Sequence, residues 1–294
     1  MATWDSRHRT DRDRTSAAAD PALFRNLCRS SPWKWQSLRF EYWDEPFTDA
    51  PGQAAPLVRA WLRRPGALRL ETADGLVLHS TTGINDSRDG LYVSATRKSW
   101  LLPPHLVTPV YDDHGLVRRR PEAAYGEPGF GNGRFSASLD PVELAGNAPV
   151  PLEFPHANAV EVLAPIGEVS HEGRRALETV VSPNPGYRPS DPQTPLCRQG
   201  RTKVRVDTET GVCVASEWLG EGPVGPGAAG SSQPPADAGV ASRAHEGDGT
   251  GHWMRILAVD EYMLDDLFVA ASFNLTDVRE HIEWPLGLKL PPER

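Results

Sequence analysis

Cysteine is scarce in this chain, and the few copies are poorly placed for chemistry that needs pairs. The 294 residues contain Cys28, Cys197 and Cys213, which lie far apart and form no C-x-x-C pair. Zinc ribbons and dithiol redox centres use closely spaced pairs, so the sequence excludes both kinds of site. Three distant cysteines also make no disulfide framework, and we expect a reducing compartment.

Long apolar runs are absent as well. No stretch approaches the roughly 20 apolar residues of a membrane-spanning helix. Residues 1–20 are charged and hold no apolar run of signal-peptide length. We therefore expect a cytoplasmic protein without a membrane span.

A strongly basic character is missing too, because the formal net charge is −8. Binding to a phosphate backbone depends on Lys and Arg, so we expect no nucleic-acid partner. The one basic cluster, residues 118–120, follows a predicted turn, and we interpret it as the solvated end of a strand. The sequence holds no nucleophile elbow, phosphate loop or metal-ligand spacing. We expect no cofactor and no metal.

Glycine and proline are abundant, with 26 and 28 copies, which disfavours long helices and suits short strands joined by turns. The clearest pattern covers residues 203–268. Two β-rich runs, 203–207 and 212–218, meet through an acidic turn that ends in Gly211, and a third run begins at Met254. This order predicts an antiparallel meander, with positive φ at Gly211 and at Gly75 in a similar Asp-Gly turn.

The rest of the chain fits the same fold class. Strand patterns recur at residues 37–43, 57–63, 68–72, 76–81, 91–96, 107–111, 116–120, 160–163, 168–171 and 174–181. Asp20 and Pro21 predict the start of a helix that ends at Ser30-Ser31-Pro32, and we expect a helical turn at 140–144 and a short helix at 275–284. We predict a mainly β (α+β) protein with a strongly curved antiparallel sheet, a half-barrel, and one or two short helices.

One domain accounts for most of the chain. We expect a flexible arm at residues 1–19, a single domain at 20–284 and a tail at 285–294. Irregular loops are predicted at 121–158 and 183–200. Residues 220–251 are rich in Gly and Pro and have almost no large apolar side chains, so we predict a disordered insertion within a hairpin.

Three phrases in this order resemble the lipoprotein-carrier (LolA-like) superfamily, which includes periplasmic sigma-factor regulatory proteins and many actinobacterial proteins. They are residues 58–65 with 68–72, residues 172–176 and residues 204–211, and together they span about two thirds of the chain. The resemblance implies a curved antiparallel sheet wrapped around helices. It also implies a concave side that holds an acyl chain or another apolar ligand.

Candidate catalytic residues are few. His171 beside Glu172 is the most interesting pair, because a carboxylate can orient an imidazole for proton transfer. Asp207 is a further candidate, as one of the carboxylates of the C-terminal half that could act in an acid/base pair. His114 beside Asp112 and Asp113 is a weaker candidate for a metal site than for a turn.

Aromatic side chains supply the material for an apolar site. We select as candidate ligand-binding residues Phe40, Tyr42, Trp100, Trp218 and Trp253, which lie on or beside predicted strands. Core packing is the alternative for each of them. If strand alternation holds, Trp43 and Trp61 are exposed or face a partner. Among the cysteines, Cys213 is expected to be buried and Cys197 to be the more reactive thiol.

Three functions remain open. The first is a cytoplasmic binding protein for a hydrophobic small molecule or an acyl chain. The second is a cofactor-independent enzyme of specialised metabolism, of the cyclase or isomerase type, that uses the same cavity to position its substrate. The third is a regulatory module that binds a protein partner through an exposed sheet edge.

Overall fold

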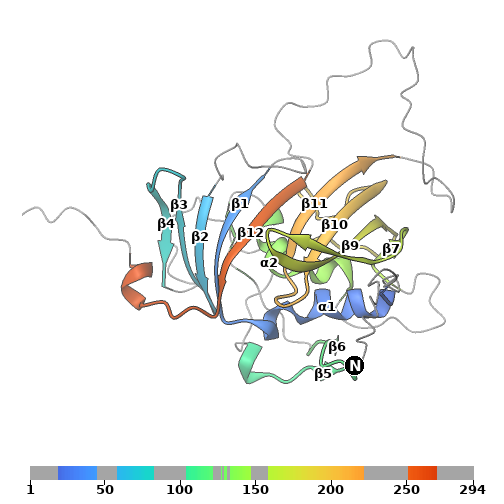
Figure 1. The fold of residues 1–294 in the computed structure, drawn as a ribbon, viewed down its shortest axis with the longest axis horizontal. Coiled ribbons are helices and arrows are strands. Elements are labelled where there is room, and N and C mark those ends of the chain that lie inside the picture. The colour runs from blue at the N-terminus through green and yellow to red at the C-terminus, as the bar shows by residue number, and fades with distance from the viewer. Residues whose placement is uncertain are drawn as a thin grey trace, which may run out of the picture.

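The computed structural model describes residues 19–44, 58–82, 104–121, 127, 129–130, 133–146, 158–221 and 251–269. In this part of the chain, ten strands form one antiparallel sheet that is strongly curved but not closed (Figure 1). The predicted fold class, mainly β with a curved antiparallel sheet and short helices, is confirmed. The predicted strand at 91–96 and the predicted helix at 275–284 lie outside the described residues.

The strand order across the sheet is β4-β3-β2-β1-β12-β11-β10-β9-β7, and β8 also pairs with β9. The strands are β1 Ser37–Trp43, β2 Val58–Arg63, β3 Ala67–Glu71, β4 Val77–Thr81, β7 Val160–Val162, β8 Gly167–His171, β9 Arg174–Pro183, β10 Arg201–Asp207, β11 Cys213–Gly220 and β12 Gly251–Val259. A separate ribbon pairs β5 Val110–Tyr111 with β6 Val117–Arg119. The helices are α1 Pro21–Lys34 and α2 Gly133–Leu139, with short 3-10 turns η1 Pro104–Leu106, η2 Pro141–Leu144 and η3 Asp265–Phe268.

The meander predicted from residues 203–268 is present. β10 pairs with β11, and β11 pairs with β12 so that Ser216 lies opposite His252. Residues 220–251 therefore connect two neighbouring strands. Most of this segment, residues 222–250, lies outside the described residues.

The first helix starts where the sequence predicts. Asp20 Oδ1 accepts the backbone N–H of Ala22 at 2.9 Å, and Pro21 occupies the first turn. The predicted end at Ser30-Ser31-Pro32 is wrong, because α1 continues through Pro32 to Lys34. Pro32 has no backbone N–H to donate within the helix. Hydrogen bonds to other elements hold the last turn instead: the Ser31 hydroxyl, for example, donates to the carbonyl oxygen of Leu139 at 2.6 Å.

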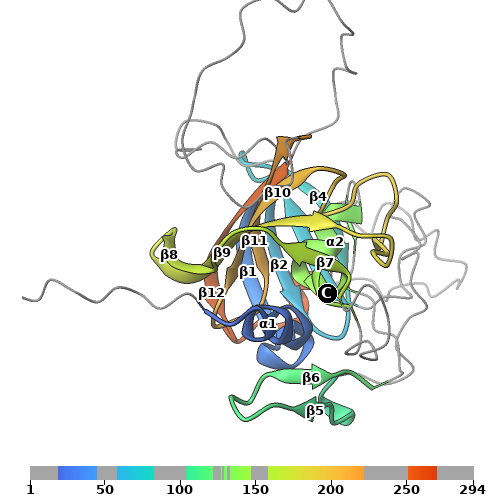
Figure 2. The same ribbon diagram turned by 90° about the vertical axis from the view of Figure 1, so that its right-hand side faces the viewer.

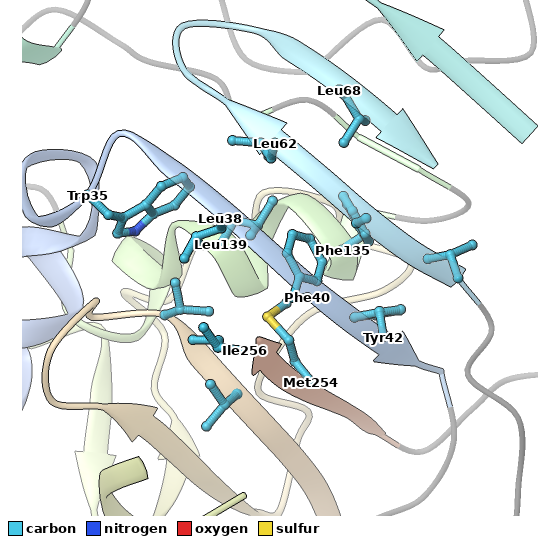
Figure 3. Packing of buried hydrophobic residues seen from close by; sticks show 14 of the residues in the cluster. Trp35, Leu38, Phe40, Tyr42, Leu62, Leu68, Phe135, Leu139, Met254 and Ile256 are labelled. Carbon is cyan, nitrogen blue, oxygen red and sulfur yellow. The ribbon is translucent and has the colours of Figure 1, made fainter. Parts of the chain in front are cut away.

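Both helices pack against the inner face of the sheet. Phe135 and Leu139 of α2 join a cluster with the inward side chains of β1, β2, β3, β11 and β12 (Figure 3). α1 packs below β9, β10 and β11, where Phe24 and Leu27 contact a second cluster that includes Val204. β8 lies on the other side of the sheet from α2 (Figure 2).

Alternation along β1 and β2 follows the prediction, but the exposure of the outer face does not. Trp43 points outward as expected, yet it is only 5% exposed, because it packs with Ala215 and Trp253. Trp61 is half-buried against the η3 region, near Phe268. Neither tryptophan is exposed, which contradicts that alternative of the prediction, because other elements of the chain cover this side of the sheet.

The described residues of the predicted irregular loop 121–158 include helical elements. They contain η2, which matches the helical turn expected at 140–144, and also α2, which was not predicted. The basic cluster is also only partly as expected. Arg118 and Arg119 are exposed, but Arg120 is buried and forms an ion pair with Asp140.

The turn glycines give a first test of the fold. Gly75 and Gly211 both have positive φ, +90° and +71°, as predicted. A Cβ at Gly75 would meet nothing within 4 Å, whereas one at Gly211 would lie 2.8 Å from the carbonyl oxygen of Leu27. We expect Gly75→Val to lower the free energy of unfolding by about 1 kcal/mol and Gly211→Val by about 2 to 3 kcal/mol. Urea unfolding of both variants measures this, and equal losses would contradict the tight contact at Gly211.

Candidate functional site

The hydroxyl group of Tyr42 is the most unusual polar group beneath the sheet. The side chain lies on the inner face near the end of β1 and is only 2% exposed. Its hydroxyl oxygen is buried and has no hydrogen-bond partner among the residues that the structure describes. Leaving a buried polar group unpaired costs about 1 to 3 kcal/mol, so such groups are rare in folded proteins.

Apolar and aromatic groups surround the Tyr42 ring. Phe135 of α2 packs edge-on against it, with ring centroids 5.2 Å apart, and Phe135 also contacts Phe40, at 5.7 Å (Figure 3). The imidazole of His252 stacks on Tyr42 with ring centroids 5.8 Å apart and an interplanar angle of 16°. β1 begins directly after α1, so this site lies at the opposite end of β1 from that helix (Figure 1).

A partly buried ion pair, in which Arg134 is buried and the side chain of Asp44 is 24% exposed, lies beside this aromatic group. Nη1 of Arg134 donates to Oδ1 of Asp44 at 3.0 Å and to the carbonyl oxygen of Gly251 at 3.1 Å. Arg134 is in the first turn of α2 and is 1% exposed, and Asp44 directly follows β1. The pair therefore links the helix to the ends of β1 and β12.

Both charges influence Tyr42. Burial raises the pKa of the phenol well above its usual value, the carboxylate of Asp44 raises it further, and Arg134 acts in the opposite direction. The phenol is therefore protonated at neutral pH. It presents an O–H donor among apolar side chains.

His252 and Ser216 form a second polar pair on the same face. Nε2 of His252 lies 2.7 Å from the carbonyl oxygen of Cys213, and Nδ1 lies 2.8 Å from the hydroxyl oxygen of Ser216. A carbonyl oxygen only accepts, so we assign the ring proton to Nε2, and the Ser216 hydroxyl donates to Nδ1. Both side chains are buried.

This pair resembles a nucleophile with its base, but the imidazole is a weak base. Burial lowers the pKa of His252 to about 3; the bond to Cys213 opposes this shift, and Arg134 and His171 add to it. General bases work best with a pKa near the operating pH. The bond therefore fixes the imidazole ring beside Tyr42 rather than activating Ser216.

The three predicted catalytic residues interact electrostatically, because, against the effect of burial, Glu172 and Asp207 both raise the pKa of His171, but in the described part of the chain no hydrogen bond joins them. Nε2 of His171 lies 2.8 Å from the carbonyl oxygen of Met254, and its ring packs on Trp253 at 4.3 Å. Burial lowers the pKa of His171. Glu172, which has a φ of +50°, accepts instead from Trp253 Nε1 at 3.1 Å and from Arg255 Nε at 2.9 Å.

Asp207 has a structural role at the β10–β11 turn. Its Oδ1 accepts from the backbone N–H and the hydroxyl of Thr210, each at 2.8 Å, and its Oδ2 accepts from Nε of Arg174 at 2.8 Å. In the described part of the chain, no hydrogen bond joins Asp207 to His171 or Glu172. Asp207 thus stabilises the turn.

The predicted ligand-binding aromatics separate into two groups. Phe40 and Tyr42 lie together on the inner face. Trp253 is buried on the outer face and cannot share a site with them. Trp218 is partly exposed and donates to the carbonyl oxygen of Gln199 at 2.8 Å. Trp100 lies outside the described residues.

The other candidates have ordinary structural roles. Cys197, expected to be the more reactive thiol, is buried, and burial raises its pKa to about 12. Cys213 is buried, as predicted. Oδ1 of Asp112 accepts the backbone N–H groups of His114 and Leu116, which is turn chemistry. Within the described ranges, no group of three or more His, Cys, Asp or Glu side chains is arranged to hold a metal ion.

Four residues of this site were not predicted from the sequence: Asp44, Arg134, Ser216 and His252. Alternation along a strand places His252 on the same face as the apolar residues Met254 and Ile256, and this was the one signal that it faces inward. Its partner Ser216 is separated from it by the long insertion, so the register of the two strands was not readable. Arg134 belongs to a helix that was not predicted.

Comparison with family models, with curated proteins and with solved structures finds no match for this chain. The resemblance to lipoprotein carriers therefore rests on the order of sequence phrases alone. None of the described helices has the length and apolar composition needed to cross a membrane.

Proposed function

We propose that this protein binds an apolar small molecule or an acyl chain at the inner face of its sheet, with the polar end of that molecule at Tyr42. The observation that carries the proposal is the buried hydroxyl of Tyr42 without a partner. Phenylalanine would fill the same space without this cost, so a bound acceptor is a good physical reason for a tyrosine here.

The surroundings suit a molecule that is apolar over most of its length. Phe40, Phe135 and Met254 belong to one apolar cluster with Tyr42. Ligand sites of this kind are mostly apolar and have a few placed polar groups that fix the orientation of the ligand. Tyr42 would be that polar group, and α2 would contact the ligand from the side opposite the sheet.

An enzyme of the cyclase or isomerase type is the second candidate, because a phenol beside Arg134 can polarise a carbonyl group. The imidazole stacked on Tyr42 is a weak proton acceptor, with a pKa of about 3. Binding without proton transfer is therefore the function that this geometry supports better. Turnover of a bound probe, followed by mass spectrometry, would favour the enzyme.

A binding experiment tests the proposal. Long-chain acyl compounds and polyketide-like molecules should stabilise the folded chain by about 2.7 kcal/mol at a hundredfold excess over Kd. Thermal unfolding measures this shift, and tryptophan fluorescence should change with it. Saturation at one ligand per chain, measured by displacement of a fluorescent acyl ester, separates a site from surface adsorption. If a diverse apolar library gave neither response, the binding function would be contradicted, and the protein-interaction hypothesis would remain.

A further inference from the structure

The charges around Tyr42 define which polar group the ligand carries. We infer that this group is an uncharged oxygen acceptor, the carbonyl of an ester, amide or ketone, and not a carboxylate. This inference rests on the proposed binding function and names the ligand class for the same site.

The ionised side chains of the site already balance each other. Arg134 carries one positive charge and Asp44 one negative charge, and they are joined at 3.0 Å. His252 is neutral, because Nδ1 accepts a hydrogen bond from the Ser216 hydroxyl and burial disfavours the imidazolium. The Asp191 carboxylate also interacts with Arg134, so carboxylates of the protein balance the positive charge of Arg134 without a ligand.

A ligand carboxylate would disturb this balance. It would bring a second negative charge close to Asp44, and it would compete with Asp44 for Arg134. An unpaired charge in a buried site is far more costly than an unpaired neutral group. Arg134 is also held by the carbonyl oxygen of Gly251 at 3.1 Å, so turning it toward a new anion would break a second bond.

A carbonyl oxygen matches what Tyr42 lacks. The phenol is protonated, and its O–H needs one acceptor and no additional charge. An ester or ketone oxygen supplies that acceptor, and the rest of the molecule can stay against Phe40 and Phe135. The neutral end of an acyl derivative thus fits both the hydrogen-bonding and the charge of the site.

Three probes with one chain length separate the possibilities: methyl decanoate, the decanoate anion and decane, at about pH 7.5, where the acid is ionised. With the full chain we expect methyl decanoate to bind about five- to tenfold more tightly than decane, in line with one added hydrogen bond. We expect the decanoate anion to bind more weakly than the ester. Isothermal calorimetry or displacement of a fluorescent ester measures all three.

Tyr42→Phe is the decisive variant, and Tyr262→Phe, at a tyrosine that is 86% exposed, is its matched control. Without ligand, Tyr42→Phe should melt about 2 to 6 °C higher than the parent, because it removes an unpaired buried hydroxyl. With ligand, it should lose the preference for the ester and bind decane as before. Tyr262→Phe should change neither quantity.

The outcomes distinguish this inference from the proposed function. If none of the three probes binds, the binding function is wrong, and the inference falls with it. If decane and the ester bind equally, or the anion binds best, the protein still binds apolar molecules but the carbonyl assignment is overturned. A lower melting temperature for Tyr42→Phe would show that the hydroxyl has a structural partner, and that also overturns the assignment.

Discussion

Replacing Arg120 with methionine is expected to lower the free energy of unfolding by about 3 to 5 kcal/mol. Nη1 of Arg120 donates to Oδ2 of Asp140 at 3.0 Å, and Nη2 donates to Oδ1 of the same carboxylate. Both side chains are almost fully buried, and Nε of Arg120 also donates to the carbonyl oxygen of Arg29 in α1 at 2.9 Å. The variant removes both of these hydrogen bonds from the buried Asp140 carboxylate and the positive charge that faces it.

Urea unfolding of three variants tests this expectation. Arg119→Met changes an exposed neighbour and should alter stability by less than about 0.5 kcal/mol. The double variant Arg120→Met with Asp140→Leu removes both charges and should recover most of the loss, because neither charge of the pair is left facing an apolar residue. Asp140 makes no side-chain cap for η2, so its replacement removes no cap. A double variant less stable than Arg120→Met would contradict the ion-pair explanation.

Arg120 also shows where sequence reasoning ends. Residues 118–120 are three identical side chains after a turn, and alternation along a strand says which of them share a face. It does not say what covers that face. Arg120 is buried because α1 and the residues before η2 lie against it, and the contact between Arg120 and Asp140 is set by tertiary packing.

The sheet itself was predictable because its signals are local. The Asp74-Gly75 turn and the turn that ends at Gly211 need positive φ, and the alternation of Leu38, Phe40 and Tyr42 sets one apolar face. α2 was missed because seven residues give barely two turns of periodicity, although Phe135 and Leu139 have helical spacing. Short helices depend on tertiary contacts, and those are not written in the local pattern.

The candidate site was only half predictable for a related reason. Tyr42 was selected as an aromatic residue on an apolar face, and that placement is confirmed. Its chemistry depends on Asp44, Arg134 and His252, which come from three separate elements. Sequence spacing does not predict that these residues meet. Their positions depend on the pairing of β11 with β12 across the long insertion and on where the short helix α2 packs.

Acidification provides the second large effect, through His252. Burial lowers the pKa of this imidazole to about 3 in the folded chain, whereas in the unfolded chain it is about 6.5. Between these two values the unfolded state takes up a proton and the folded state does not. The contribution of the neutral His252 imidazole to the free energy of unfolding is therefore complete above about pH 6.5. It is lost as the pH falls toward 3, at about 1.4 kcal/mol per pH unit.

The loss two units below the unfolded pKa, near about pH 4.5, should reach about 2.7 kcal/mol from His252 alone. Urea unfolding at about pH 7.5 and 4.5 measures it. In His252→Asn, the loss of unfolding free energy between these two pH values should be smaller than in the parent by about 2.7 kcal/mol. This holds whatever the stability of the variant at the higher pH. Met254→Ala, which removes a buried side chain and no histidine, is the matched control and should keep the parent slope. His171, whose pKa burial also lowers, contributes in the same direction, so His252→Asn should leave part of the dependence in place. An identical dependence of the unfolding free energy on pH in His252→Asn and in the parent would mean that the imidazole is not held neutral beside Tyr42. The charge argument for the proposed site would then lose the neutral His252 on which it depends.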